Sequence, residues 1–192
     1  MYSQVLAATT FATATVAALL LAPSVDAAPA TTIPGNGTYA VGSDIQPGTY
    51  VSSNPGYCSW YRLSSLSGDG HIIASDNTAS GKQYVTIAPS DVGFKTNSCS
   101  TWSLASMTPA SQPSTTIPGD GTYAVGVDIQ PGSYVSSNPG YCSWYRLSGF
   151  SGSGQIIASD NTASGKQYVT IAPSDVGFKT NSCATWNLAT SR

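Results

Sequence analysis

The chain has 192 residues and a formal net charge of −2, and all nine of its acidic residues are Asp. So sparse a charge gives no basic field, which disfavours nucleic acid and anionic lipid as main partners. Abundant Ser, Thr, Gly, Tyr and Asn indicate an uncharged surface that forms hydrogen bonds.

Residues 1–27 have the pattern of a secretory signal peptide. An apolar run from Val5 to Ala22 precedes Val25-Asp26-Ala27, which fits a small-x-small cleavage site. A retained membrane anchor is the alternative, although the run is diluted by Thr and is short for a span. We expect a protein that is secreted or associated with the cell surface, with no membrane span after cleavage of the signal.

The rest of the chain contains one module twice. Residues 31–106 (module 1) return as residues 115–190 (module 2) with ten of 76 positions changed, and residues 107–114 form a Pro/Ser linker. We expect two beads on a short tether. The changes are mostly small or polar swaps, as expected of solvated positions. They are Asn36/Asp120, Ser43/Val127, Thr49/Ser133, Ser65/Gly149, Leu66/Phe150, Asp69/Ser153, His71/Gln155, Ser100/Ala184, Ser103/Asn187 and Ser106/Thr190.

The pattern within a module predicts an all-β fold. Alternating or β-rich segments predict strands at residues 37–42, 45–51, 57–63, 72–74, 83–87 and 102–104. Pro47-Gly48 is expected at the centre of a turn, and residues 75–81 have the composition of a loop. Seven or so short strands separated by turns predict a small β-sandwich or jelly-roll-like module, present twice in tandem.

The cysteines predict one disulfide per module. Four cysteines allow three pairings, but two copies of one fold form the same bond twice, which gives Cys58–Cys99 and Cys142–Cys183. Export makes such bonds chemically reasonable. Zinc is the competing use of the thiols, and two thiols per module lack the clustered partners that it needs.

Shared catalytic chemistry has little support in the sequence. His71 is the only histidine and its counterpart is Gln155, so the two modules share no His-dependent triad or metal cluster. Asp44, Asp76 and Asp91 could supply a carboxylate pair, but turn and cap positions explain each better. The oxygens of residues 75–81 are too few for calcium. We predict no enzyme, no cofactor and no metal site.

Aromatic side chains are the best functional lead, because each module has more Tyr than a small core can hold. Exposed Tyr beside amide groups suits stacking on sugar rings, whereas cross-strand packing is the alternative for any single Tyr. Arg62 could donate to a ligand or, as we favour, pair with an Asp. The predicted ligand-binding residues are Tyr57, Tyr61, Arg62, Asn77, Tyr84, Tyr141, Tyr145, Arg146, Asn161 and Tyr168.

These motifs together resemble a family of small exported proteins and lipoproteins of actinobacteria. The residues that carry the resemblance are Gly37-Thr38-Tyr39-x-Val41-Gly42-x-Asp44-Ile45-x-Pro47-Gly48-x-Tyr50, Cys58-x-Trp60-x-Arg62, Ile72-Ile73-Ala74-x-Asp76-Asn77, Val85-Thr86-Ile87 and Cys99-x-x-Trp102. The resemblance spans both modules. It implies an extracytoplasmic location and a disulfide-containing β-module, and it carries no established activity.

The sequence therefore predicts a secreted, non-catalytic tandem binding module for a cell-envelope glycan or another envelope polymer, in which duplication supplies avidity. The alternative is a structural or protein-interaction protein of the cell surface whose modules dock through Tyr-rich sheet faces. The expected partners are accordingly an extracellular glycan, an envelope polymer or a protein.

Overall fold

The computed structural model describes residues 28–54, 56–67, 71–138 and 140–189. The predicted signal peptide lies outside these residues. Among them, no helix has the length and apolar character needed to cross a membrane.

Within the described residues, each module has eight strands. Module 1 contains β1 (Thr32–Ile33), β2 (Gly37–Ala40), β3 (Gly48–Asn54), β4 (Cys58–Leu63), β5 (Ile72–Thr78), β6 (Gly81–Ile87), β7 (Gly93–Asn97) and β8 (Trp102–Leu104). Module 2 contains β9 (Thr116–Ile117), β10 (Gly121–Ala124), β11 (Gly132–Asn138), β12 (Cys142–Leu147), the short 3₁₀ helix η1 (Ser153–Gln155), β13 (Ile156–Thr162), β14 (Gly165–Ile171), β15 (Gly177–Asn181) and β16 (Trp186–Leu188).

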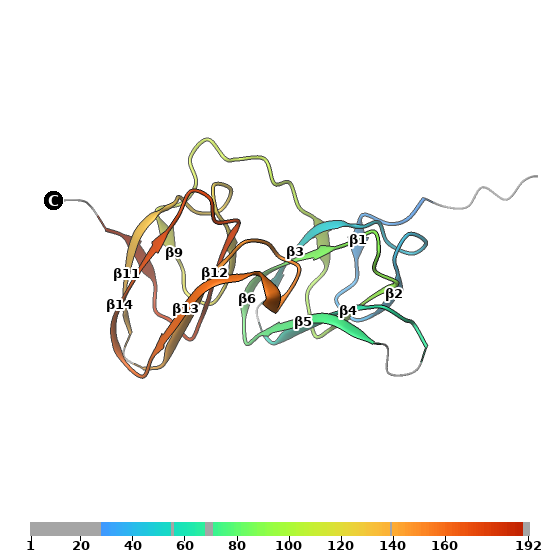
Figure 1. Cartoon of the computed structure of the whole chain (residues 1–192), viewed down its shortest axis with the longest axis horizontal. Helices are drawn as coiled ribbons and strands as arrows, with labels where there is room; N and C mark the ends of the chain where they lie inside the picture. Colours follow the sequence, from blue (N-terminus) through green and yellow to red (C-terminus); the bar gives the residue numbers. More distant parts are fainter. Residues whose placement is uncertain (1–27, 55, 68–70, 139, 190–192) are drawn as a thin grey trace, which may run out of the picture.

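The strands of each module form two facing antiparallel sheets. In module 1 the orders are β1-β8-β3-β6 and β2-β7-β4-β5, and module 2 repeats them as β9-β16-β11-β14 and β10-β15-β12-β13. Two four-stranded sheets in this order are a jelly roll. The prediction of two tandem β-sandwich or jelly-roll-like modules is therefore confirmed (Figure 1).

The core of each module lies between its two sheets. In module 1, Trp60, Phe94 and Trp102 are almost fully buried, and the last two rings meet edge to face with centroids 5.8 Å apart. Aromatic pairs of this geometry stabilise a core beyond their buried area alone. Alternation along β4 directs Cys58 and Trp60 into this core, as the sequence predicts.

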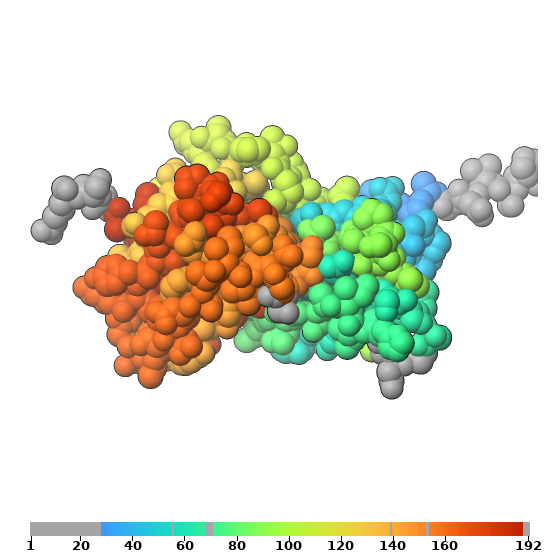
Figure 2. Space-filling model, viewed as in Figure 1, coloured from blue at the N-terminus to red at the C-terminus, as the bar shows by residue number. Residues whose placement is uncertain are grey.

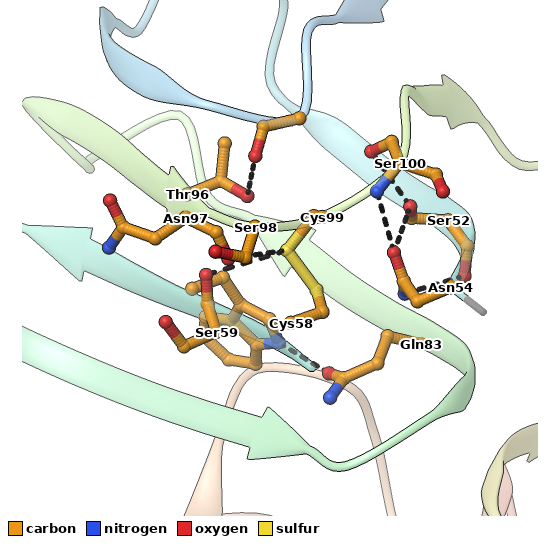
Figure 3. Close-up of a disulfide and its surroundings, with 12 residues drawn as sticks. Ser52, Asn54, Cys58, Ser59, Gln83, Thr96, Asn97, Ser98, Cys99 and Ser100 are labelled. Atoms are coloured by element: carbon orange, nitrogen blue, oxygen red, sulfur yellow. Dashed lines mark hydrogen bonds between the residues drawn. A yellow bond between two sulfur atoms is a disulfide. The ribbon is translucent and has the colours of Figure 1, made fainter. Parts of the chain in front are cut away.

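Both predicted disulfides are confirmed: Cys58 is bonded to Cys99, and Cys142 to Cys183. Next to the first bond, the Ser100 amide donates to Asn54 Oδ1 at 2.7 Å and the Ser52 hydroxyl donates to the same oxygen at 3.0 Å (Figure 3). Closing a loop of this length stabilises each module by roughly 4 kcal/mol, which compensates for a small core.

Two local predictions are wrong. Residues 75–81 are not a loop, because β5 pairs with β4 as far as Thr78 and β6 begins at Gly81. Pro47-Gly48 is not the centre of a turn, because Gly48 already pairs with Ile87. The turn lies at residues 42–44, where the Asp44 carboxylate accepts a hydrogen bond from the Ala40 amide at 2.8 Å. Cross-strand pairing has overridden local composition in both places.

The two modules pack against each other, which corrects the expectation of two separate beads. A parallel contact between β6 and β10, with Lys82 opposite Gly121, joins a sheet of module 1 to a sheet of module 2. The surfaces of the modules meet along this junction while the linker passes outside it (Figures 1 and 2). The linker also contacts module 2, because the Ala110 amide donates to the Gly126 carbonyl at 3.0 Å.

Candidate functional site: the cleft between the modules

The outer face of β6 provides the contact of module 1 with module 2. Gln83 and Val85 point into the core of module 1, so alternation directs Tyr84 toward the neighbouring module. The Tyr84 ring stacks on Phe150 with centroids 4.8 Å apart, and its hydroxyl donates to Asp128 at 2.9 Å. Tyr84 is only 6% exposed and anchors this interface.

Charged groups reinforce the interface at both ends. Lys82 Nζ lies 2.7 Å from Asp128 Oδ1, and Lys179 forms an ion pair with Asp76 across the same junction. The Arg62 guanidinium donates to the Ser151 carbonyl at 2.7 Å. The two ion pairs bring opposite charges from the two modules together, and all three contacts help to fix the register of the modules.

Arg62 is oriented by a second, buried contact within its own module. Its Nε and Nη2 donate to the two carboxylate oxygens of Asp91 at 2.6 and 2.8 Å, so the favoured pairing of Arg62 with an Asp is confirmed. Arg146 pairs with Asp175 in the same way. Burial opposes the charge of Asp175, but the hydrogen bonds from Arg146 and the Ala172 amide hold the pKa of that carboxyl below its usual value.

Four of the ten positions that differ between the modules lie at this interface on the module 2 side. The Asp120 carboxylate accepts from the Ser80 hydroxyl at 3.3 Å, Val127 and Phe150 belong to the shared apolar cluster, and Gly149 lines the cleft described below. The interpretation of the differing positions as solvated is therefore wrong for these four. It fails because the same positions in module 1, Asn36, Ser43 and Leu66 among them, have no neighbouring module to cover them.

A cleft of about 320 Å³ lies between the modules. Domain interfaces are common places for ligand sites, and aromatic walls with a few polar groups are typical of them. Its walls are Trp60, Ser75, Asp76, Asn77 and Tyr84 from module 1 and Thr122, Tyr145, Leu147, Gly149, Phe150, Gly152, Ile156, Lys179 and Asn181 from module 2. Asp76 and Lys179 neutralise each other, so the described walls offer amides, hydroxyls and aromatic surface without an unbalanced charge.

Four phenols, Tyr84 at the cleft and three in the module cores, have raised pKa values and are hydrogen-bond donors at neutral pH. Burial and the neighbouring Asp128 carboxylate raise the pKa of Tyr84 far above its ordinary value. Burial, Asp120 and Asp128 raise the pKa of Tyr123 to about 12. Burial also raises the pKa of Tyr50 and Tyr134 in the two cores. Since desolvation disfavours the charged form, these hydroxyls keep their protons.

The structure places the predicted ligand-binding residues in several different environments. It brings Asn77, Tyr84 and Tyr145 together at the cleft. The remaining seven residues are not among the walls of the cleft. Those with large exposed surfaces are Tyr57, Tyr141, Asn161 and Tyr168, whereas Tyr61 is half-buried and Arg62 and Arg146 are engaged by Asp91 and Asp175.

Sequence reasoning missed Phe150, Lys179 and Asn181, all of which line the cleft. Phe150 carried a signal, because it differs from its counterpart Leu66 in size. Lys179 and Asn181 carried none, because module 1 has the same residues at the equivalent positions. Among the described residues, no three His, Cys, Asp or Glu side chains gather closely enough to hold a metal ion.

Comparison with known proteins identifies the module. The model of the Rv1352-like extracellular domain family matches residues 31–103 and again residues 115–187. The chain belongs to this family. The uncharacterized protein Rv1352 of Mycobacterium tuberculosis and the uncharacterized protein Mb1387 of Mycobacterium bovis are each 33% identical to the chain over 100 residues, covering 45% of this chain and 81% of the relative. No solved structure matches the chain.

Membership of this family confirms the predicted location outside the cytoplasm, secreted or at the cell surface. The two disulfides agree with that location. Both relatives are mycobacterial proteins, in agreement with the resemblance to exported actinobacterial proteins.

Proposed function

We propose that this extracellular Rv1352-like protein is a non-catalytic binding protein that holds a neutral glycan of the cell envelope in the cleft between its modules. The observation that carries the proposal is the composition of the cleft. Tyr145 and Phe150 offer aromatic surface, and Asn77 and Asn181 offer amide groups, within one space of about 320 Å³. Sugar rings present C–H faces that pack on aromatic rings and hydroxyls that form hydrogen bonds with amides. The aromatic and the amide side chains of the cleft would therefore both contact a bound sugar.

The charge of the cleft favours a neutral ligand over an ionic one. Lys179 and Asp76 pair with each other, and Lys82 pairs with Asp128 nearby. An anionic or cationic ligand would have to displace one of these partners and leave the other without a counter-charge. A neutral polyol needs no such exchange.

The proposed site is one composite cleft and not two equal sites. Its walls come from different faces of the two modules: β4, β5 and β6 of module 1, and β10, β12, β13, β15 and the segment between β12 and η1 of module 2. Duplication therefore supports this proposal by creating a junction, whereas the avidity hypothesis requires a complete site in each module.

The test begins with a glycan and envelope-polymer binding screen of the oxidised chain. Calorimetry with a ligand from that screen then compares Asn181→Ala with Asn97→Ala, the same substitution at the equivalent position of module 1. We expect about a tenfold weaker affinity for Asn181→Ala, since one hydrogen bond is lost, and no change for Asn97→Ala. Equal losses of affinity in both variants would instead support two equal sites. A screen that finds no glycan or envelope polymer bound by the chain would contradict the proposal.

The docking of Tyr84 on module 2 favours a second candidate function. Here the protein is a cell-surface interaction protein whose Tyr-bearing sheet faces bind other proteins, as one such face already binds its neighbour. This function predicts concentration-dependent association in solution and no response in the glycan screen.

A further inference from the structure

The contact between the modules joins two different surfaces. The face of β6 belongs to module 1 and the end that bears β10 belongs to module 2, so the interface is heterologous. Because the modules are copies, each molecule has a second example of both surfaces. We call Asp160, Ser164, Lys166 and Tyr168 the β14 face, and Asn36, Asp44, Leu66 and Lys95 the β2 end.

Both of these additional surfaces are uncovered within the molecule. Tyr168 is 67% exposed, whereas its counterpart Tyr84 is 6% exposed. Leu66 is 48% exposed, whereas its counterpart Phe150 is 5% exposed. The β14 face and the β2 end lie at opposite ends of the molecule (Figure 1).

Each surface also carries a strand that is the edge of its sheet in the part of the chain that the structure describes. Strand β14 is an edge of the sheet β14-β11-β16-β9, and β2 is an edge of the sheet β2-β7-β4-β5. Their counterparts β6 and β10 are the two strands that pair with each other across the modules. Exposed edge strands are templates for pairing with another chain.

We propose that the β14 face of one molecule docks on the β2 end of the next, so that the protein assembles head to tail. The intramolecular interface supplies the contacts. Lys166 and Tyr168 stand where Lys82 and Tyr84 contact Asp128, and Asp44 takes the place of Asp128.

A second charge pair repeats at the other end of the junction. Lys95 and Asp160 stand where Lys179 pairs with Asp76, and both side chains are exposed. Each contact therefore joins a cation to an anion, and the two surfaces are complementary in charge. Neither contact depends on what the cleft binds.

The intermolecular junction is weaker than the intramolecular one. Ser43 and Leu66 replace Val127 and Phe150, so the β2 end offers less apolar surface than its counterpart. The linker also raises the effective concentration of module 2 near module 1, and no linker joins separate molecules. A heterologous contact gives a closed ring when its rotation closes and an open filament when it does not. We therefore expect short filaments that lengthen with protein concentration, or rings whose population rises with it.

Sedimentation of the oxidised protein at concentrations up to about 1 mM tests this proposal. We expect the average mass to rise with concentration and the association constant to rise about tenfold in the double variant Ser43→Val, Leu66→Phe. Tyr168→Ala should abolish association. Tyr141→Ala is the matched control. Its counterpart Tyr57 is 55% exposed although module 1 is docked on module 2, and Tyr141 itself is 54% exposed. Docking therefore does not cover this position, and its substitution should leave association unchanged.

A mixing experiment tests the head-to-tail geometry. Lys95→Asp places two carboxylates in the junction and Asp160→Lys places two ammonium groups there, so each variant alone should remain monomeric. Mixing them should restore association, because the intact β14 face of the first variant meets the intact β2 end of the second. Both side chains are exposed, so neither change disturbs a core.

Three outcomes overturn the proposal. The first is a constant mass for both the wild type and the double variant. The second is association that survives in both charge variants, which indicates another surface. The third is a mixture of the charge variants that stays monomeric while the wild type associates.

Discussion

Strands β6 and β14 have the same seven residues, Gly-Lys-Gln-Tyr-Val-Thr-Ile, and different surroundings. The Gln, Val and Ile positions face the core in both. The Tyr position is buried in β6 and exposed in β14, because only β6 has a module packed on it. Identical sequence thus specifies the inner face of the strand, while its outer face depends on what stands beside the module. Each module provides a matched control for the other.

The largest difference between the two strands is expected from removing the Tyr ring. Tyr84→Ala should cost about 3–5 kcal/mol of unfolding free energy, because the ring stacked on Phe150 is lost and Asp128 loses a donor. Tyr168→Ala should change stability by no more than about 0.5 kcal/mol. Guanidinium unfolding followed by Trp fluorescence measures both.

Small-angle scattering adds a second measurement to this pair. Loss of the Tyr84 contact should separate the modules and increase the maximum dimension of Tyr84→Ala, while Tyr168→Ala keeps the dimension of the wild type. Equal losses of stability in the two variants would show that the ring contributes only within its own module.

The next largest difference is expected at the glycine that begins each strand. Gly81 and Gly165 have φ angles of +93° and +104°, so Ala strains the backbone at both. A Cβ at Gly81 would lie 2.1 Å from the Asp120 carbonyl oxygen, whereas a Cβ at Gly165 meets nothing within 4 Å. Gly81→Ala should therefore destabilise the protein by about 1–3 kcal/mol more than Gly165→Ala. Thermal unfolding of both variants checks the difference, and equal effects would contradict the contact.

Much of the fold follows from the sequence. The repeat determines the disulfide pairing, and alternation places Cys58 and Trp60 in the core. The sequence predicts a strand only at residues 72–74, whereas β5 continues to Thr78. The prediction is too short because Ser75, Asp76 and Asn77 are turn formers that pair with β4 only in the folded sheet. Local composition describes a residue's preference, and cross-strand partners decide its conformation.

The cleft could not be predicted in the same way. Its walls come from both modules, and the residues that the two copies share do not show which face of one module meets which face of the other. The differences between the copies were the available signal. Ser43/Val127 and Leu66/Phe150 both add apolar volume in module 2, where the interface buries it. A gain of apolar size in one copy alone therefore indicates a surface that has acquired a partner.

A smaller effect is expected from alkaline pH. The pKa of Tyr123 is raised to about 12 in the folded protein, above the ordinary value of 10.0. The contribution of the protonated phenol is thus fully present below about pH 10 and is lost as the pH rises to about 12. Discounted for partial solvation, the loss should be roughly 1 kcal/mol. The unfolding free energy should fall less steeply with pH across this range in Tyr123→Phe than in the wild type. An equally steep fall in both would assign the loss to other groups.

The smallest difference is expected for the paired lysines. Lys82 forms its ion pair with Asp128 at a side-chain exposure of 32%, and exposed pairs contribute little because water screens them and the long side chain loses entropy. Lys82→Ala should cost about 0.2–1 kcal/mol, and Lys166→Ala should cost nothing measurable as long as the protein is dilute. At high concentration Lys166→Ala should weaken self-association while Lys82→Ala spares it, since Lys166 belongs to the β14 face. Paired unfolding and sedimentation measurements therefore separate the two copies of this lysine. A Lys166→Ala variant that associates like the wild type would confine the role of this position to the interface inside the molecule.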